Sequence, residues 1–201
     1  LLDDSRPGRR EAGLALLAEL ERAAGGDGAP SGAVRIGITG APGAGKSTLL
    51  DALVRRLRAD GRTVGIFAVD PSSRVSGGAL LGDRARVRSH AGDPGVFFRS
   101  MAARERLGGL ADATWPSVAV LSAVFDVVFI ETVGVGQSEA EVAELVDTLL
   151  FVAQPGAGDV LQFMKAGILE HPDVFAVNKA GLSAFAVRTA RELEAALGKP
   201  R

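Results

Sequence analysis

The apolar residues of this chain fall into short continuous runs separated by longer segments of mixed polarity. Strands that are buried on both faces show such runs, whereas strands with one solvated face alternate. Apolar residues at helical spacing fill most of the intervals between the runs. This alternation predicts an α/β fold, with a mostly parallel, doubly wound sheet flanked by helices. The predicted strands are residues 34–39, 63–69, 127–130, 148–153 and 174–177, and the predicted helices are 11–24, 46–59, part of 110–123, 139–145, 160–169 and 185–197.

A stretch rich in Gly, Ala, Pro and Ser at residues 25–32 has the composition of a linker. We therefore expect an N-terminal helix and linker at residues 1–32 and one α/β domain at residues 33–201. The length suits one domain of this class, and hydrophobic residues at 47% with charged residues at 23% are typical of a globular chain.

Charge and cysteine content narrow the possible functions. A net charge of −1 argues against a general role at nucleic acids or membrane surfaces. The sequence has no cysteine, which excludes disulfides, thiolate metal sites and cysteine nucleophiles, and fits a reducing cytoplasm. No apolar run approaches the ~18 residues of a membrane helix, and no signal peptide is visible. We therefore expect a cytoplasmic protein.

The segment after the first predicted strand reads Gly-Ala-Pro-Gly-Ala-Gly-Lys-Ser and matches the phosphate-binding template G-x-x-x-x-G-K-[S/T] without mismatch. Such a turn directs backbone N–H groups into one concavity, and the following helix adds the positive end of its dipole. The lysine reaches the outer phosphates and the serine hydroxyl can hold Mg²⁺. A turn without a ligand needs neither residue. The candidate nucleotide-binding residues are Gly40, Ala41, Pro42, Gly43, Ala44, Gly45, Lys46, Ser47 and Thr48.

Acidic residues follow the predicted strands, at the edge where a parallel sheet binds its ligands. Asp70 follows the second strand, Glu131 follows the third, and Asp83 lies after a glycine-rich segment. All three are candidates for Mg²⁺ binding. Asp70 can instead cap a turn, and Asp83 can instead begin a helix. Gly134 would let a backbone N–H approach a γ-phosphate, so this loop could change with the phosphate state.

The fifth predicted strand is followed by Asn178-Lys179-Ala180-Gly181. Guanine-nucleotide enzymes carry Asn-Lys-x-Asp here, with the Lys stem on the purine and the Asp accepting hydrogen bonds from guanine. We expect Asn178 and Lys179 to contact the base. Gly181 lacks the carboxylate, and losing one charged partner costs about 1.5–3 kcal/mol, a roughly 10- to 150-fold loss of guanine preference.

Seven segments together resemble the MeaB/ArgK-type GTPases, which are accessory proteins of cobalamin-dependent acyl-CoA mutases, methylmalonyl-CoA mutase above all. The resemblance covers roughly residues 9–197, and its most specific string is Glu-Thr-Val-Gly-Val-Gly-Gln-Ser from Glu131, because most related GTPases begin this string with Asp. The segments are residues 40–48, 69–73, 78–83, 107–110, 131–139, 155–159 and 177–180.

The resemblance implies hydrolysis of GTP to GDP and phosphate with Mg²⁺, coupled to adenosylcobalamin delivery and to protection of the mutase. It also implies a homodimer of the full-length protein, and switch loops at residues 131–136 and 155–159, the second facing the mutase. By position, it implies catalytic roles for Lys46, Asp70 and Glu131. It places Ser47, Asp70, Asp83 and Glu131 around the metal.

The sequence departs from the family pattern at three places. Gly181 replaces the base-reading Asp, Trp115-Pro116 interrupts a helix, and the chain ends at Arg201, before the last strand and the dimerisation arm that the family pattern leads us to expect. Three functions stay open: a slow GTPase switch stimulated by its partner, a nucleotide-binding chaperone with weak or relaxed GTP/ATP hydrolysis, and a small-molecule kinase. The last is disfavoured because no Arg-rich lid segment follows the third strand.

Overall fold

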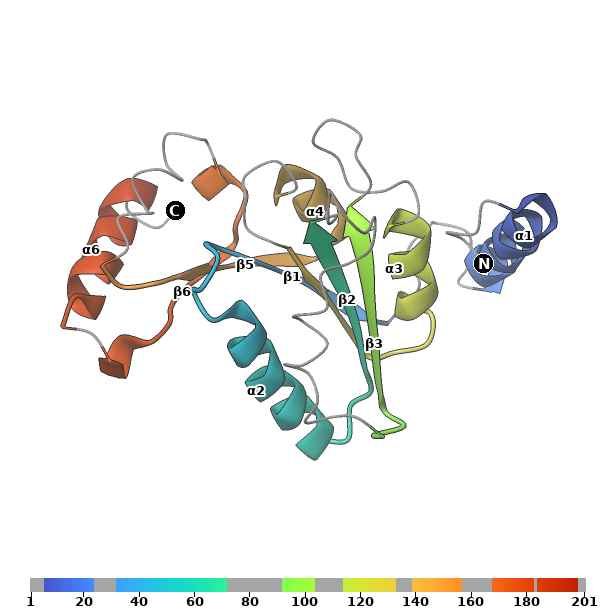
Figure 1. The fold of residues 1–201 in the computed structure, drawn as a ribbon, viewed down its shortest axis with the longest axis horizontal. Coiled ribbons are helices and arrows are strands. Elements are labelled where there is room, and N and C mark those ends of the chain that lie inside the picture. Colours follow the sequence, from blue (N-terminus) through green and yellow to red (C-terminus); the bar gives the residue numbers. More distant parts are fainter. Residues whose placement is uncertain are drawn as a thin grey trace.

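The computed structural model describes residues 6–23, 32–71, 92–103, 114–132, 139–156, 168–182 and 184–198. Within these ranges six strands form one parallel sheet in the order β3-β2-β4-β1-β5-β6 (Figure 1). The strands are β1 (Val34–Thr39), β2 (Val64–Pro71), β3 (Val96–Ala103), β4 (Val127–Glu131), β5 (Thr148–Ala153) and β6 (Val174–Val177). The helices are α1 (Pro7–Ala23), α2 (Lys46–Ala59), α3 (Thr114–Ser122), α4 (Glu139–Leu145) and α6 (Ala186–Leu197), with short 3₁₀ helices η3 (Ile168–Glu170) and η4 (Ala180–Leu182).

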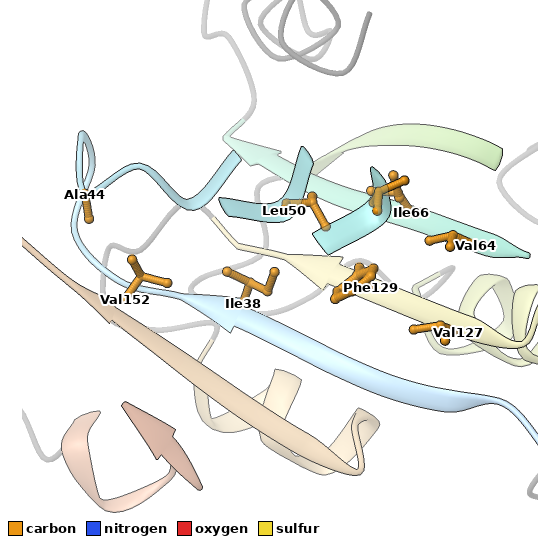
Figure 2. Close-up of a cluster of buried hydrophobic side chains, with 9 residues drawn as sticks. Ile38, Ala44, Leu50, Val64, Ile66, Val127, Phe129 and Val152 are labelled. Atoms are coloured by element: carbon orange, nitrogen blue, oxygen red, sulfur yellow. The ribbon is translucent and has the colours of Figure 1, made fainter. Parts of the chain in front are cut away.

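Helices cover both faces of the sheet, with α2 on one side and α3 and α4 on the other (Figure 1). Leu50 and Val54 of α2 pack onto strand residues that include Ile38 and Phe129, and this cluster is shown in Figure 2. On the opposite face, Val142 of α4 belongs to a second apolar cluster. The two clusters explain why the strands read as continuous apolar runs, because their side chains are buried alternately on both faces.

The strand register brings three carboxyl ends together beside the loop that follows β1. Ile38 is opposite Glu131 of β4 on one side and opposite Leu150 of β5 on the other. Ala68 of β2 is opposite Glu131 in turn. The turn from β1 into α2 therefore starts between β4 and β5, which is where open α/β sheets bind ligands.

Aspartates at the other end of the sheet tie neighbouring strands together. The carboxylate of Asp126 accepts hydrogen bonds from the backbone N–H and the hydroxyl of Thr63, at 2.7 and 2.8 Å. The carboxylate of Asp147 accepts one from the backbone N–H of Arg35 at 2.8 Å and pairs with its guanidinium. Hydrogen bonds to the charged form lower the pKa of both carboxyl groups: those from Thr63 act on Asp126, and those from Arg35 act on Asp147.

The fold class predicted from the sequence is confirmed, and so are the bounds of β1, α2, α4, β5 and β6. Several details differ. β3 was not predicted, β2 continues through Asp70 to Pro71, β4 continues to Glu131, and α1 begins at Pro7 instead of residue 11. Of the helix expected at 160–169, the structure describes residues 168 and 169, which lie in η3. The described helices include none that is long and apolar enough to cross a membrane.

Trp115 and Pro116, which depart from the family pattern, belong to α3. Both residues lie in the first turn of α3, which begins at Thr114. Proline is tolerated there because the first backbone N–H groups of a helix have no partner within it. Trp115 is exposed. Helix α3 contacts the N-terminal helix α1, which lies beside it in Figure 1.

Candidate nucleotide-binding site

The phosphate loop between β1 and α2 depends on glycine at two positions. Gly40 has φ 133°, and a Cβ atom there would overlap the backbone carbonyl of Val152. Gly45 caps α2 with φ 94°, and a Cβ atom there would overlap the side-chain amide of Asn178. Only glycine satisfies both requirements, the left-handed backbone and the missing side chain. The loop therefore packs closely on two neighbouring strand ends.

Lys46 lies at the start of α2 and is 7% exposed. Its ammonium donates hydrogen bonds to the backbone carbonyls of Gly40 at 2.7 Å and Ala41 at 3.2 Å. The positive charge is thereby held inside the loop, beside the N-terminus of α2. Both features favour an anion in this concavity.

Ser47 and Glu131 meet across the loop. The Ser47 hydroxyl donates to Glu131 Oε1 at 2.7 Å, and both side chains are buried. Glu131 reaches this place because it is the last residue of β4, while Ser47 lies in the first turn of α2. Next to them, the hydroxyl of Thr132 donates to that of Thr39 at 3.0 Å.

The Ser47–Glu131 pair fits Mg²⁺, which prefers oxygen ligands and commonly takes only one or two from the protein. The described residues hold no group of three or more His, Cys, Asp or Glu side chains that would suit another kind of metal centre. When bound with a nucleotide, Mg²⁺ would neutralise charge on the phosphates.

The turn after β6 packs on the other side of the phosphate loop. The Asn178 side-chain amide donates to the carbonyl of Ala44 at 2.8 Å. The Lys179 ammonium donates to the carbonyl of Gly43 at 2.6 Å. Lys179 adopts the left-handed backbone conformation, with φ 55°, which is uncommon for a residue with a long side chain. The phosphate loop and the expected base-binding turn are thus one connected structure.

These elements surround a cleft of about 410 Å³. Eight residues expected from the sequence line the cleft, namely Pro42, Gly43, Gly45, Lys46, Ser47, Thr48, Glu131 and Lys179. Asn178 does not line it but donates to the carbonyl of Ala44 in the adjoining loop. Thr132, Ala68 and Val69 also line the cleft but were not predicted. The full set of described lining residues is Pro42, Gly43, Gly45, Lys46, Ser47, Thr48, Ala68, Val69, Glu131, Thr132 and Lys179.

Several predicted residues lie partly or wholly outside the described part of the chain. Asp70 is placed by its backbone only, in β2, two positions beyond Ala68 and opposite Ala102 of β3. Asp83 and Gly134 lie outside the described residues, as does most of the expected switch loop at residues 155–159.

Comparison with known proteins identifies the family. A family model described as methylmalonyl Co-A mutase-associated GTPase MeaB matches residues 1–201. The chain belongs to the MeaB family. This confirms the resemblance inferred from the motifs.

Related proteins support the assignment. A protein of Pyrococcus abyssi is 56% identical over 146 residues, which are 72% of this chain and 45% of that protein. The GTPase ArgK of Escherichia coli is 44% identical over 147 residues, 73% of this chain and 44% of ArgK. The mouse methylmalonic aciduria type A homolog, a mitochondrial protein, is 40% identical over 147 residues, 73% of this chain and 35% of that protein. The chain thus spans about half the length of such relatives or less.

Solved structures agree on the fold. The crystal structure of a LAO/AO transport system kinase matches with a TM-score of 0.71 and 30% identity, covering 100% of this chain and 57% of that chain. The hydrogenase maturation factor HypB of Archaeoglobus fulgidus matches with a TM-score of 0.62 over 92% of this chain and 83% of its own. At 19% identity, HypB supports the fold alone.

Proposed function

We propose that this chain is the nucleotide-binding part of a Mg²⁺-dependent GTPase that acts as a switch and chaperone for a cobalamin-dependent acyl-CoA mutase. The observation that carries the proposal is the buried Ser47–Glu131 pair beside the Lys46 ammonium, inside a loop closed by glycines. Transfer of a phosphoryl group needs a cation against the phosphates and oxygen ligands for Mg²⁺, and the Lys46 ammonium and the Ser47–Glu131 pair are groups of these kinds.

The residues divide the work between them. Backbone N–H groups of the phosphate loop and the Lys46 ammonium would bind the phosphates, while Ser47 and Glu131 would hold Mg²⁺. Asp70 and Asp83 remain candidates for the metal side of the site. Glu131 is the one carboxylate among the described residues that line the cleft, and it is engaged by Ser47. We therefore expect slow GTP hydrolysis in the absence of a partner, because no second carboxylate among the described lining residues is available to activate the attacking water.

The family description, which names methylmalonyl Co-A mutase, supports the mutase as partner. We also propose that the full-length protein forms a homodimer and works in the cytoplasm, since the family resemblance implies the first and the lack of cysteine fits the second.

Phosphate release tests the proposal. Purified protein with Mg²⁺ and GTP should release phosphate slowly and continuously, and Lys46→Ala should abolish the release. Arg56→Ala is the matched control, because Arg56 lies on the same helix and is exposed, and in the described part of the chain its guanidinium pairs with Asp60. Release that continues unchanged in Lys46→Ala would contradict the proposal. A phosphorylated small product in place of free phosphate would indicate a kinase.

A nucleotide-binding chaperone with weak or relaxed hydrolysis is the second candidate, and Gly181 favours it. Gly181 lies in η4, has no left-handed backbone and would offer open space to a Cβ atom. Gly181→Asp therefore adds a carboxylate whose Cβ atom meets no described atom within 4 Å. If the correspondence with Asn-Lys-x-Asp holds, the preference for GTP over ATP should rise about 10- to 150-fold.

Competitive binding of the two nucleotides measures that preference. Ala180→Asp is the matched control, because it places the same charge one residue away in the same exposed turn. An equal rise in both variants would reflect charge alone, and no rise in Gly181→Asp would show that position 181 does not face the base.

A further inference from the structure

The Lys179 ammonium has a second acceptor outside both nucleotide motifs. Besides the Gly43 carbonyl, it donates to the side-chain carbonyl oxygen of Gln154 at 3.2 Å. Gln154 directly follows β5, and the sequence gives no sign of this contact, because 25 residues separate the two. The same oxygen would be 3.9 Å from a Cβ atom on Gly43, so Gln154 also faces the phosphate loop.

The backbone around Gln154 is fixed on both sides. On one side, the carbonyl of Ala153 accepts a hydrogen bond from the backbone N–H of Asn178 at 2.9 Å. On the other side, the backbone N–H of Gly156 donates to the hydroxyl of Thr189, a buried residue of α6, at 3.4 Å. These contacts hold the backbone before and after Gln154, and its amide oxygen lies within hydrogen-bond distance of the Lys179 ammonium.

The Gln154 side-chain amide is suited to holding the Lys179 ammonium in one place. A long, exposed lysine side chain loses much of its rotamer freedom when it is held in one place. A second acceptor offsets part of that cost and fixes the direction of the ammonium. Because the amide is neutral, it leaves the positive charge intact, and an ammonium has three N–H donors, of which two are used here.

We propose that Gln154 is a positioning residue for the nucleoside half of the site. It holds Lys179 against Gly43 and thereby sets the affinity for the nucleoside, while the grip on the phosphates depends on Lys46 and the loop. The inference rests on the proposed function, since it takes the cleft to bind a guanine nucleotide.

Calorimetry with two ligands tests this. Gln154→Leu keeps the side-chain size and removes the acceptor. It should weaken GDP binding about three- to tenfold, the effect of one modest hydrogen bond. Binding of inorganic tripolyphosphate should stay within about twofold of wild type, because it has no nucleoside. In steady-state hydrolysis, KM for GTP should rise while kcat stays nearly constant.

A double-mutant cycle with Lys179→Ala shows whether Gln154 acts through the lysine. In the Lys179→Ala background, Gln154→Leu should have no further effect on GDP affinity. Additive losses, equal weakening of GDP and tripolyphosphate, or an unchanged GDP affinity in Gln154→Leu would each overturn the inference. A folded wild-type protein that binds neither ligand would overturn the proposed function itself, which is a distinguishable result.

Discussion

Replacing Gly45 by alanine tests the packing between the phosphate loop and the turn after β6. Alanine at this position has to adopt a left-handed conformation, which costs about 1–2 kcal/mol. Its Cβ atom would also displace the Asn178 amide, which donates to the carbonyls of Ala44 at 2.8 Å and Gly45 at 3.4 Å. Loss of that interaction adds about 0.5–1.5 kcal/mol. The free energy of unfolding should therefore fall by about 1.5–3.5 kcal/mol in total.

Gly43→Ala is the matched control. Gly43 also has a left-handed backbone, with φ 81°, but the nearest described atom to its Cβ position is 3.9 Å away. This variant carries the backbone cost alone, about 1–2 kcal/mol. The difference between the two variants therefore isolates the contact with Asn178.

Urea denaturation of the nucleotide-free protein measures both losses, and unchanged m-values would show that the comparison is sound. In an Asn178→Ala background the gap between the two glycine variants should close, because the displaced group is gone. If Gly45→Ala and Gly43→Ala lose the same free energy in the wild-type background, the close packing on Asn178 does not exist and the reasoning is refuted.

Three further predictions concern single side chains. Ser122→Ala should leave the thermal midpoint unchanged or raise it, because the buried Ser122 hydroxyl has no hydrogen-bond partner among the described residues; a clear drop would contradict this. Asp147→Asn should lower stability at neutral pH but not in acid. The native pKa of Asp147 is depressed, chiefly by the Arg35 side-chain hydrogen bond, so its contribution is present above the usual aspartate pKa and is lost as the pH falls below about 4 through the native value. A constant difference between pH 2 and 7 would refute this. Ser47→Ala should raise the Mg²⁺ concentration needed for half-maximal hydrolysis, and an unchanged Mg²⁺ titration would remove Ser47 from the metal site.

The core of the fold was readable from the sequence because its signals are local. The strand before the phosphate loop is a short apolar run, and the following helix begins at the lysine of the motif, so β1 and α2 were placed with correct bounds. Glu131 was also found, because an acid at the tip of a buried strand is conspicuous. These features depend on residues that are neighbours in the chain.

The missed features depend on contacts between distant segments. β3 lies at the edge of the sheet, and Arg99 and Ser100 interrupt its apolar run, so it lacks the pattern of a strand buried on both faces. The contact between Gln154 and Lys179 joins the ends of two neighbouring strands, at a lysine with a left-handed backbone that no spacing rule indicates. Thr132 lines the cleft only because β4 lies beside β1.

The central claim is that the amide-lined loop, with Lys46, Ser47 and Glu131, binds a nucleoside triphosphate with its Mg²⁺. Isothermal titration calorimetry of the folded protein with GTP and Mg²⁺ tests it most directly. The structure predicts saturable binding at one site, lost in Lys46→Ala and retained in Arg56→Ala. Absence of binding heat for every nucleoside triphosphate across a range of temperatures, with the protein shown to be folded, would contradict it.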